Sequence, residues 1–162
     1  MFRKVMVPLD GSKVAEEALQ VLDQRLACGQ VSEAILARVE RPAADVALDY
    51  LLPADVVAAA NERTIEEARH YLEETSRSIE WNGVAHRSVA MLGDPAPTLS
   101  QLAEREGVDL VLTAVEKRRG LRGLLSRGAD RLLRAFTVPV LVLGQPAERV
   151  ANPWPVRLMK AA

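Results

Sequence analysis

The chain has 162 residues, a formal net charge of −1, and hydrophobic and charged fractions of 49% and 27%. Its length suits one domain with its own buried core, and its composition is typical of a folded globular protein. The nearly balanced charge excludes a general attraction to nucleic acids or membranes, and the single Cys28 excludes an internal disulfide. The sequence shows the apolar run of neither a membrane span nor a signal peptide, so we expect a cytoplasmic protein.

Strand and helix patterns alternate from the first residues onward. A β-branched run at residues 4–9 ends at Asp10-Gly11-Ser12, a turn in which the Ser12 hydroxyl can cap the next helix. That helix carries an apolar stripe and is expected to end near Gly29. Residues 33–40 form the second predicted strand, although Arg38 interrupts their apolar run.

The middle of the chain continues the alternation. Residues 41–55 predict a loop with two prolines, and an apolar stripe from Ala54 to about Ile79 predicts a long amphipathic helix. A third strand is predicted at residues 84–90. The pair Asp94-Pro95 is typical of a helix start, and Gly107 closes that helix.

The last part of the chain contains two nearly continuous apolar runs, at residues 110–113 and 138–143. Such runs are expected of strands buried on both faces. An amphipathic helix lies between them, with its stripe running from Leu121 to Phe136. The resulting βαβαβαβαβ order predicts a parallel sheet covered by helices on both faces. Residues 145–162 form a tail whose prolines prevent one continuous helix.

Sheets of this kind bind ligands beyond the carboxyl ends of their strands, where the strand order reverses. Three segments follow strand ends in the sequence: Pro8–Ser12, Val39–Glu40 and residues 113–128. We therefore expect the ligand site, if there is one, among these segments.

Three sequence motifs point to a known family. Val7-Pro8-Leu9-Asp10-Gly11-Ser12 is similar to an opening V-x-x-D-G-S signature, and Gly93-Asp94-Pro95-Ala96 is similar to a G-x-P turn before the third helix. Residues 129–142 are similar to an A-E-R-V-L-R…C-P-V-L-V-V ending. In this order and spacing, over about residues 2–144, the chain resembles the universal stress protein family.

The resemblance implies an α/β fold over residues 1–144: an open, Rossmann-like parallel sheet of five strands in the order 3-2-1-4-5. It also implies a homodimer. Nucleotide-binding members of the family hold ATP through G-x2-G-x9-G-[S/T] after the fourth strand. That pattern falls here on Ala114, Lys117, Arg127 and Gly128, and a one-residue deletion places Ser126 and Arg127 at its last pair.

Both alignments lose the glycines that let phosphate oxygens approach backbone N–H groups. Lys117 and Arg127 place long side chains there instead, so ATP binding is expected to be weak or lost. In the alternative, the basic residues of the 116–127 loop hold ATP with Mg²⁺, or another phosphorylated ligand, through charge-assisted hydrogen bonds. In the simpler interpretation, these basic side chains lie on the solvent-exposed face of a helix and bind no ligand.

In the family, residues after the first and second strands hold the nucleoside part of the nucleotide. By resemblance, Asp10 matches a residue that helps hold the adenine end, and Pro8 and Val39 match positions bordering that ring. Gly11, Ser12, Gly93 and Ala114 complete this candidate site. For Asp10 an equal alternative is turn formation, since Asp-Gly readily makes local backbone bonds.

No catalytic or metal-ligating constellation is present in the sequence: His70 and His86 stand alone, without a nucleophile nearby. We therefore predict a non-catalytic regulatory or interaction module of the stress response, with no cofactor. An ATP-pyrophosphatase-like enzyme shares the scaffold, but Pro8–Ser12 lacks the phosphate loop that such an enzyme needs.

The expected partners are a second copy of the chain and a protein that the sequence does not identify. The run from Val138 to Leu143 would be an apolar edge strand through which two copies pair. Nucleic acid and membrane partners are not expected. Trp154, between Pro153 and Pro155 in the tail, calls for a hydrophobic groove in this molecule or its partner.

Overall fold

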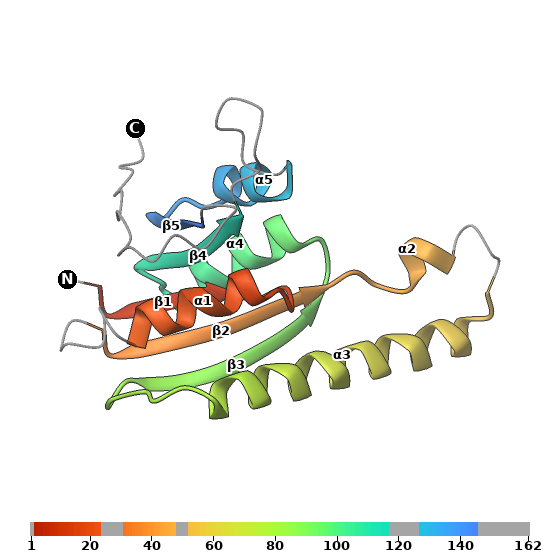
Figure 1. Ribbon diagram of the computed structural model, residues 1–162. Coiled ribbons are helices and arrows are strands. Elements are labelled where there is room, and N and C mark those ends of the chain that lie inside the picture. Colours follow the sequence, from red (N-terminus) through yellow and green to blue (C-terminus); the bar gives the residue numbers. More distant parts are fainter. Residues whose placement is uncertain (1, 24–30, 48–51, 117–126, 146–162) are drawn as a thin grey trace.

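The computed structural model describes residues 2–23, 31–47, 52–116 and 127–145. Five strands alternate with helices along the chain (Figure 1). In order, the elements are β1 (Lys4–Pro8), α1 (Lys13–Val21), β2 (Glu33–Glu40), α2 (Ala44–Ala47), α3 (Ala54–Arg77), β3 (Ala85–Leu92), α4 (Pro95–Glu106), β4 (Leu110–Glu116), α5 (Arg127–Ala135) and β5 (Val140–Gln145).

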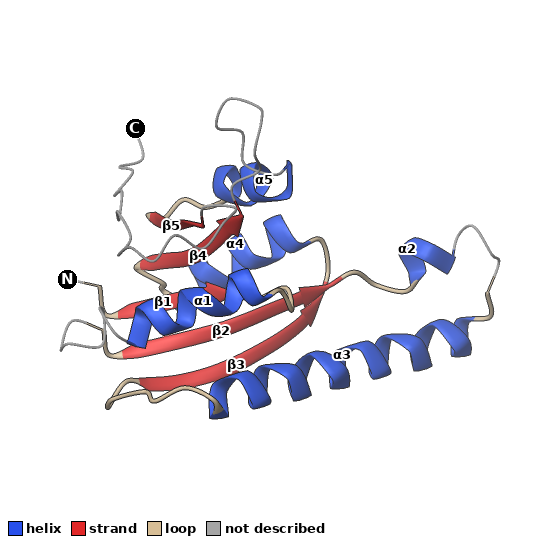
Figure 2. Cartoon of the chain, in the orientation of Figure 1, coloured by secondary structure: helices blue, strands red, loops and turns tan. Residues whose placement is uncertain are grey.

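The five strands form one parallel sheet in the order β3-β2-β1-β4-β5, which confirms the predicted fold class. β1 is the central strand, and the chain builds outward from it first on one side, through β2 and β3, and then on the other. Figure 2 shows the sheet with helices on both of its faces. Each parallel pair needs a crossover connection, which α1, α3, α4 and α5 supply.

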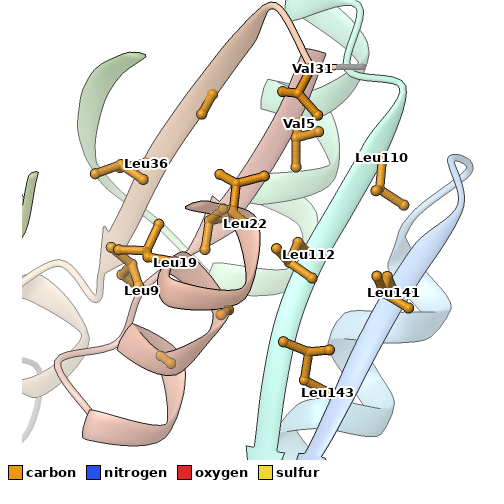
Figure 3. Close-up of a cluster of buried hydrophobic side chains, with 14 of the residues drawn as sticks. Val5, Leu9, Leu19, Leu22, Val31, Leu36, Leu110, Leu112, Leu141 and Leu143 are labelled. Atoms are coloured by element: carbon orange, nitrogen blue, oxygen red, sulfur yellow. The ribbon is translucent and has the colours of Figure 1, made fainter. Parts of the chain in front are cut away.

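The core has two layers, one on each face of the sheet. Side chains alternate along β1, so that Val5 and Val7 pack on the face covered by α1 and α3, while Met6 packs on the face covered by α4 and α5. All three are fully buried. Figure 3 shows the first layer, in which Leu19 and Leu22 lie over leucines of β2, β4 and β5.

Both well-defined helix starts of the sequence are confirmed. The Ser12 hydroxyl accepts a hydrogen bond from the Ala15 amide at 3.2 Å, as the cap of α1. α4 begins at Pro95 and ends at Gly107, whose φ of 62° is left-handed. The Asp94 side chain makes no cap bond, however, and pairs instead with Arg131 of α5.

Several element boundaries differ from those predicted. The segment expected to be a loop contains the short helix α2. β4 and β5 both extend beyond the ends of the apolar segments that predicted them, because Ala114–Glu116 pair with Leu143–Gln145. β5 starts after Pro139, which has no N–H for the ladder, although its carbonyl accepts from the Val111 amide at 2.9 Å.

The long helix α3 covers the sheet with its second half only. Its buried residues, Ala68, Leu72, Thr75 and Ser76, all belong to that half. The first half extends beyond the carboxyl ends of β2 and β3, with α2 nearby (Figure 1). A hydrogen bond joins α3 to the residue that precedes α2: the Ala43 amide donates to Asn61 Oδ1 at 2.7 Å.

Candidate functional site

The strand order reverses around β1, and the strands separate there. On the β2 side, pairing continues to Pro8 opposite Ala37, and the Leu9 amide donates to the Ala37 carbonyl at 2.8 Å. On the β4 side, the pairs are Val5 with Leu110 and Met6 with Val111, both near the start of β1. β1 and β4 therefore diverge toward their carboxyl ends, which is the geometry of a ligand crevice in such sheets.

The turn after β1 forms one wall of this crevice. Asp10 Oδ1 accepts a hydrogen bond from the Ser12 amide at 2.9 Å, so this carboxylate stabilises its own turn. Gly11 has a φ of 84°, a left-handed conformation that favours glycine. The turn-forming alternative for Asp10 is thus observed, and Ser12 serves the start of α1.

The ends of β2 and β3 continue the same edge of the sheet. Val39 packs on the α4 and α5 face, and the Gly93 amide donates to the Glu40 carbonyl at 2.8 Å. A Cβ on Gly93 would lie 2.4 Å from Thr98 Oγ1. The turn into α4 therefore leaves no room for a side chain at Gly93. The segments Pro8–Ser12 and Val39–Glu40 and the Gly93 turn lie at the ends of three neighbouring strands, on one edge of the sheet.

Arg38 of β2, which was not expected to be a site residue, makes several contacts at this edge. Its Nε donates to Glu40 Oε1 at 2.6 Å. Its guanidinium carbon lies 4.5 Å from the centroid of the Tyr71 ring, a cation–π contact. Its Nη1 also lies 3.1 Å from the position that a Cβ of Gly11 would occupy, so the guanidinium packs closely against this turn. Arg38 interrupts the apolar run of β2 in the sequence, but the run does not indicate which residues Arg38 contacts.

Tyr71 extends the cluster to α1. Its hydroxyl donates to Glu16 Oε1 at 2.9 Å. Burial of the phenol, followed by this bond to Glu16, raises the pKa of Tyr71 to about 12. Arg38 on β2, Tyr71 on α3 and Glu16 on α1 thus join three elements beside the turn after β1.

The β4 side of the crevice is described in part. Ala114 is partly buried and packs against the core on the α1 face. Lys117 and Ser126 lie outside the described residues. Arg127 is the first residue of α5, and its side chain is not among those described. The basic loop that the sequence places at the phosphate end therefore remains a prediction.

Carboxylate residues end or follow the first three strands at this edge: Asp10, Glu40 and Asp94. Arginines pair with two of them, Arg38 with Glu40 and Arg131 with Asp94.

Other titratable groups lie away from the crevice. His70 is exposed on α3 beside Glu74, and His86 stacks on Trp81 with their ring centroids 4.2 Å apart. Arg87 bridges Glu33 and Glu106 at the opposite, amino end of the sheet and, with Lys4, lowers the pKa of Glu33. In the described part of the chain, no group of three or more His, Cys, Asp or Glu side chains could hold a metal.

No helix within the described ranges is both long and apolar enough to cross a membrane.

A parallel sheet in this order, with helices on both faces, places the protein in the class of open, Rossmann-like α/β folds. A family model described as "Universal stress protein family" matches residues 1–144. The chain belongs to the universal stress protein family.

Individual relatives agree with this assignment. Universal stress protein MJ0531 of Methanocaldococcus jannaschii is 27% identical over 148 residues, covering 90% of this chain and 84% of the relative. The solved structure of MJ0577 superimposes with a TM-score of 0.73 at 23% identity, covering 90% of this chain and 97% of that one.

A family protein from Arabidopsis thaliana, solved with AMP bound, has a TM-score of 0.59 at 18% identity, covering 90% of this chain and 93% of that one. At these identities the two structures show the shared fold.

Proposed function

We propose that this universal stress protein is a non-catalytic regulatory or interaction module in which ATP binding is weak or lost. The observation that carries the proposal is the replacement of the family's phosphate-loop glycines by Lys117 and Arg127. In the family's manner of binding, long side chains at these positions would compete with phosphate oxygens for the space beside the backbone.

A nucleotide-binding switch is the second candidate. It is favoured by the first-strand half of the crevice, where the turn at Asp10–Ser12 and the end of β2 are in place. The Arabidopsis relative, which shares the fold, was solved with AMP bound. In this chain the phosphate end would depend on basic residues of the 116–127 loop.

Thermal unfolding with ATP and Mg²⁺ separates the two candidates. A ligand at a hundredfold its Kd stabilises the folded state by about 2.7 kcal/mol, which shifts the Tm by several degrees. The module proposal predicts no shift at millimolar ATP. A shift of several degrees that disappears in Lys117→Gln would establish the switch and refute the loss of ATP binding.

We also propose that two copies pair through the edge of β5, the strand expected at residues 138–143. β5 is the last strand of the sheet, and Val140 and Val142 are partly exposed on it. An apolar strand at a sheet edge invites the addition of another strand. Charging this edge by Val140→Lys with Val142→Lys should convert the dimer to a monomer in sedimentation or light scattering. An unchanged dimer would exclude this interface.

A further inference from the structure

The turn that joins α3 to β3 contains an asparagine followed by a glycine, Asn82-Gly83 (Figure 1). Both residues have a left-handed φ, 43° and 89°, and the Val84 amide donates to the Trp81 carbonyl at 2.8 Å across the turn. This is the pattern of a type I′ turn, for which Asn-Gly is a favoured central pair. Both residues are exposed, so the turn presents the Asn82 side chain and the peptide after it to water.

An asparagine before a glycine can react with its own backbone. The nitrogen of the following peptide loses its proton to a base and attacks the side-chain carbon Cγ. The bond between Cγ and the amide nitrogen breaks, and ammonia leaves. Water then opens the resulting succinimide ring at either carbonyl, which yields aspartate or isoaspartate. The reaction needs no partner except water, and a following glycine favours it because no side chain hinders the attack.

The attacking group is accessible at Gly83. Nothing lies within 4 Å of the point where a Cβ of Gly83 would sit. Among the described residues, the Gly83 amide donates no hydrogen bond that the reaction would have to break. The peptide after Asn82 is therefore free to turn toward the side chain.

The other two asparagines of the chain lack these features. Asn61 lies within α3, where Oδ1 accepts from the Ala43 amide and Glu62 follows. Asn152 precedes Pro153, which has no N–H to lose. Reaction through the backbone nitrogen is thus expected at Asn82 alone.

The Asn82 amide also forms a contact that the reaction would remove. Nδ2 donates to Asp23 Oδ1 at 2.9 Å and to the Glu80 carbonyl at 3.3 Å. Asp23 follows α1, so the first bond ties the end of that helix to the turn before β3. Aspartate at position 82 would bring a second carboxylate against Asp23, and like charges repel. Isoaspartate would in addition lengthen the backbone of the turn.

We propose that Asn82 is a site of spontaneous deamidation, and that its conversion breaks the tie between Asp23 and the turn before β3. The turn precedes the first residue of β3, at the edge of the sheet opposite the crevice. The inference is therefore independent of both candidate functions.

The test of the site follows the full, folded chain during incubation at mildly alkaline pH, well below its Tm. Mass spectrometry of proteolytic peptides should show a growing exchange of NH₂ for OH at Asn82, faster at higher pH, and none at Asn61. Asn82→Gln is the matched control, because it keeps the amide but moves it one methylene further from the backbone nitrogen. No conversion at Asn82, or equal conversion at Asn61, overturns the proposal.

The test of the consequence uses thermal unfolding. Asn82→Asp should lower the Tm by about 2–4 °C, the shift that a loss of one polar contact causes in a domain of this size. Asp23→Asn in the Asn82→Asp background should restore most of this loss, because it recreates an amide–carboxylate pair with the partners exchanged. An unchanged Tm in Asn82→Asp, or no restoration in the double variant, overturns the role of Asp23.

Discussion

Gly11 and Arg38 show how one residue pair shapes the candidate site. Gly11 adopts a left-handed φ of 84°, and its missing Cβ leaves room for the Arg38 guanidinium at 3.1 Å. Gly83 has a similar φ of 89° with nothing within 4 Å of its Cβ position. A side chain at Gly83 would meet only backbone strain, whereas a side chain at Gly11 would also meet the Arg38 guanidinium. Comparing the two positions therefore distinguishes the two effects.

We expect Gly83→Ala to lower the free energy of unfolding by about 1–2 kcal/mol, the cost of left-handed backbone for an L-residue. Gly11→Ala should cost more, because Arg38 must also move away from Tyr71. Denaturant unfolding of both variants measures the difference. Equal losses would mean that the contact with Arg38 contributes nothing to stability.

Tyr71 predicts a pH dependence of stability. Its pKa in the folded state is raised to about 12, above the value near 10 of an unfolded chain. The folded state holds this proton more tightly, so its contribution is complete below pH 10 and is lost as the pH rises toward 12. Tyr71→Phe should remove this part of the alkaline destabilisation.

The chain has two tyrosines, Tyr50 and Tyr71. In a Tyr50→Phe background, ultraviolet titration of the folded protein therefore follows Tyr71 alone. The expected result is an ionisation displaced upward from 10 toward 12. A midpoint near 10 would contradict the burial and the bond to Glu16.

Single residues were predictable where the cause is local. The Ser12 cap and the Pro95 helix start depend on neighbours a few residues away, and the structure confirms both. The partners of Asp94 and Arg38 depend on α5 and α3, which are distant in sequence. Local patterns carry no information about such contacts, so the Arg38 cluster could not be predicted.

At the scale of the element, α3 joins a packed half to a half that extends past the sheet. Leu72 is fully buried in the packed half, whereas Val56 in the other half is 46% exposed. The apolar stripe of the sequence runs through both halves, because periodicity reports a helix and not the length of the surface that it covers. Hydropathy likewise does not report where strand pairing stops, so β4 and β5 end at later residues than their apolar runs do.

Leu72→Ala should lower the free energy of unfolding by about 2–5 kcal/mol through the lost transfer energy and the cavity left behind. Val56→Ala should change it by less than about 0.5 kcal/mol, as is usual for an exposed site. Urea unfolding followed by circular dichroism compares the two variants. A similar loss in both would show that the first half of α3 is covered in solution.

At the scale of the whole molecule, the alternation of strands and helices fixes a parallel sheet, and the family resemblance supplies its strand order. Both are confirmed. The reversal of strand order at β1 creates a crevice in any sheet of this order, whether or not it binds a ligand. The sequence could therefore predict the place of the crevice. What the crevice binds stays a prediction, because most of the 116–127 loop lies outside the described residues.

The central claim is that the scaffold of a universal stress protein is intact here while its ATP cradle is not. The most direct measurement is the nucleotide content of the freshly purified full chain, released by denaturation and quantified by chromatography. The account predicts less than stoichiometric, near-background ATP. About one ATP per chain would contradict it.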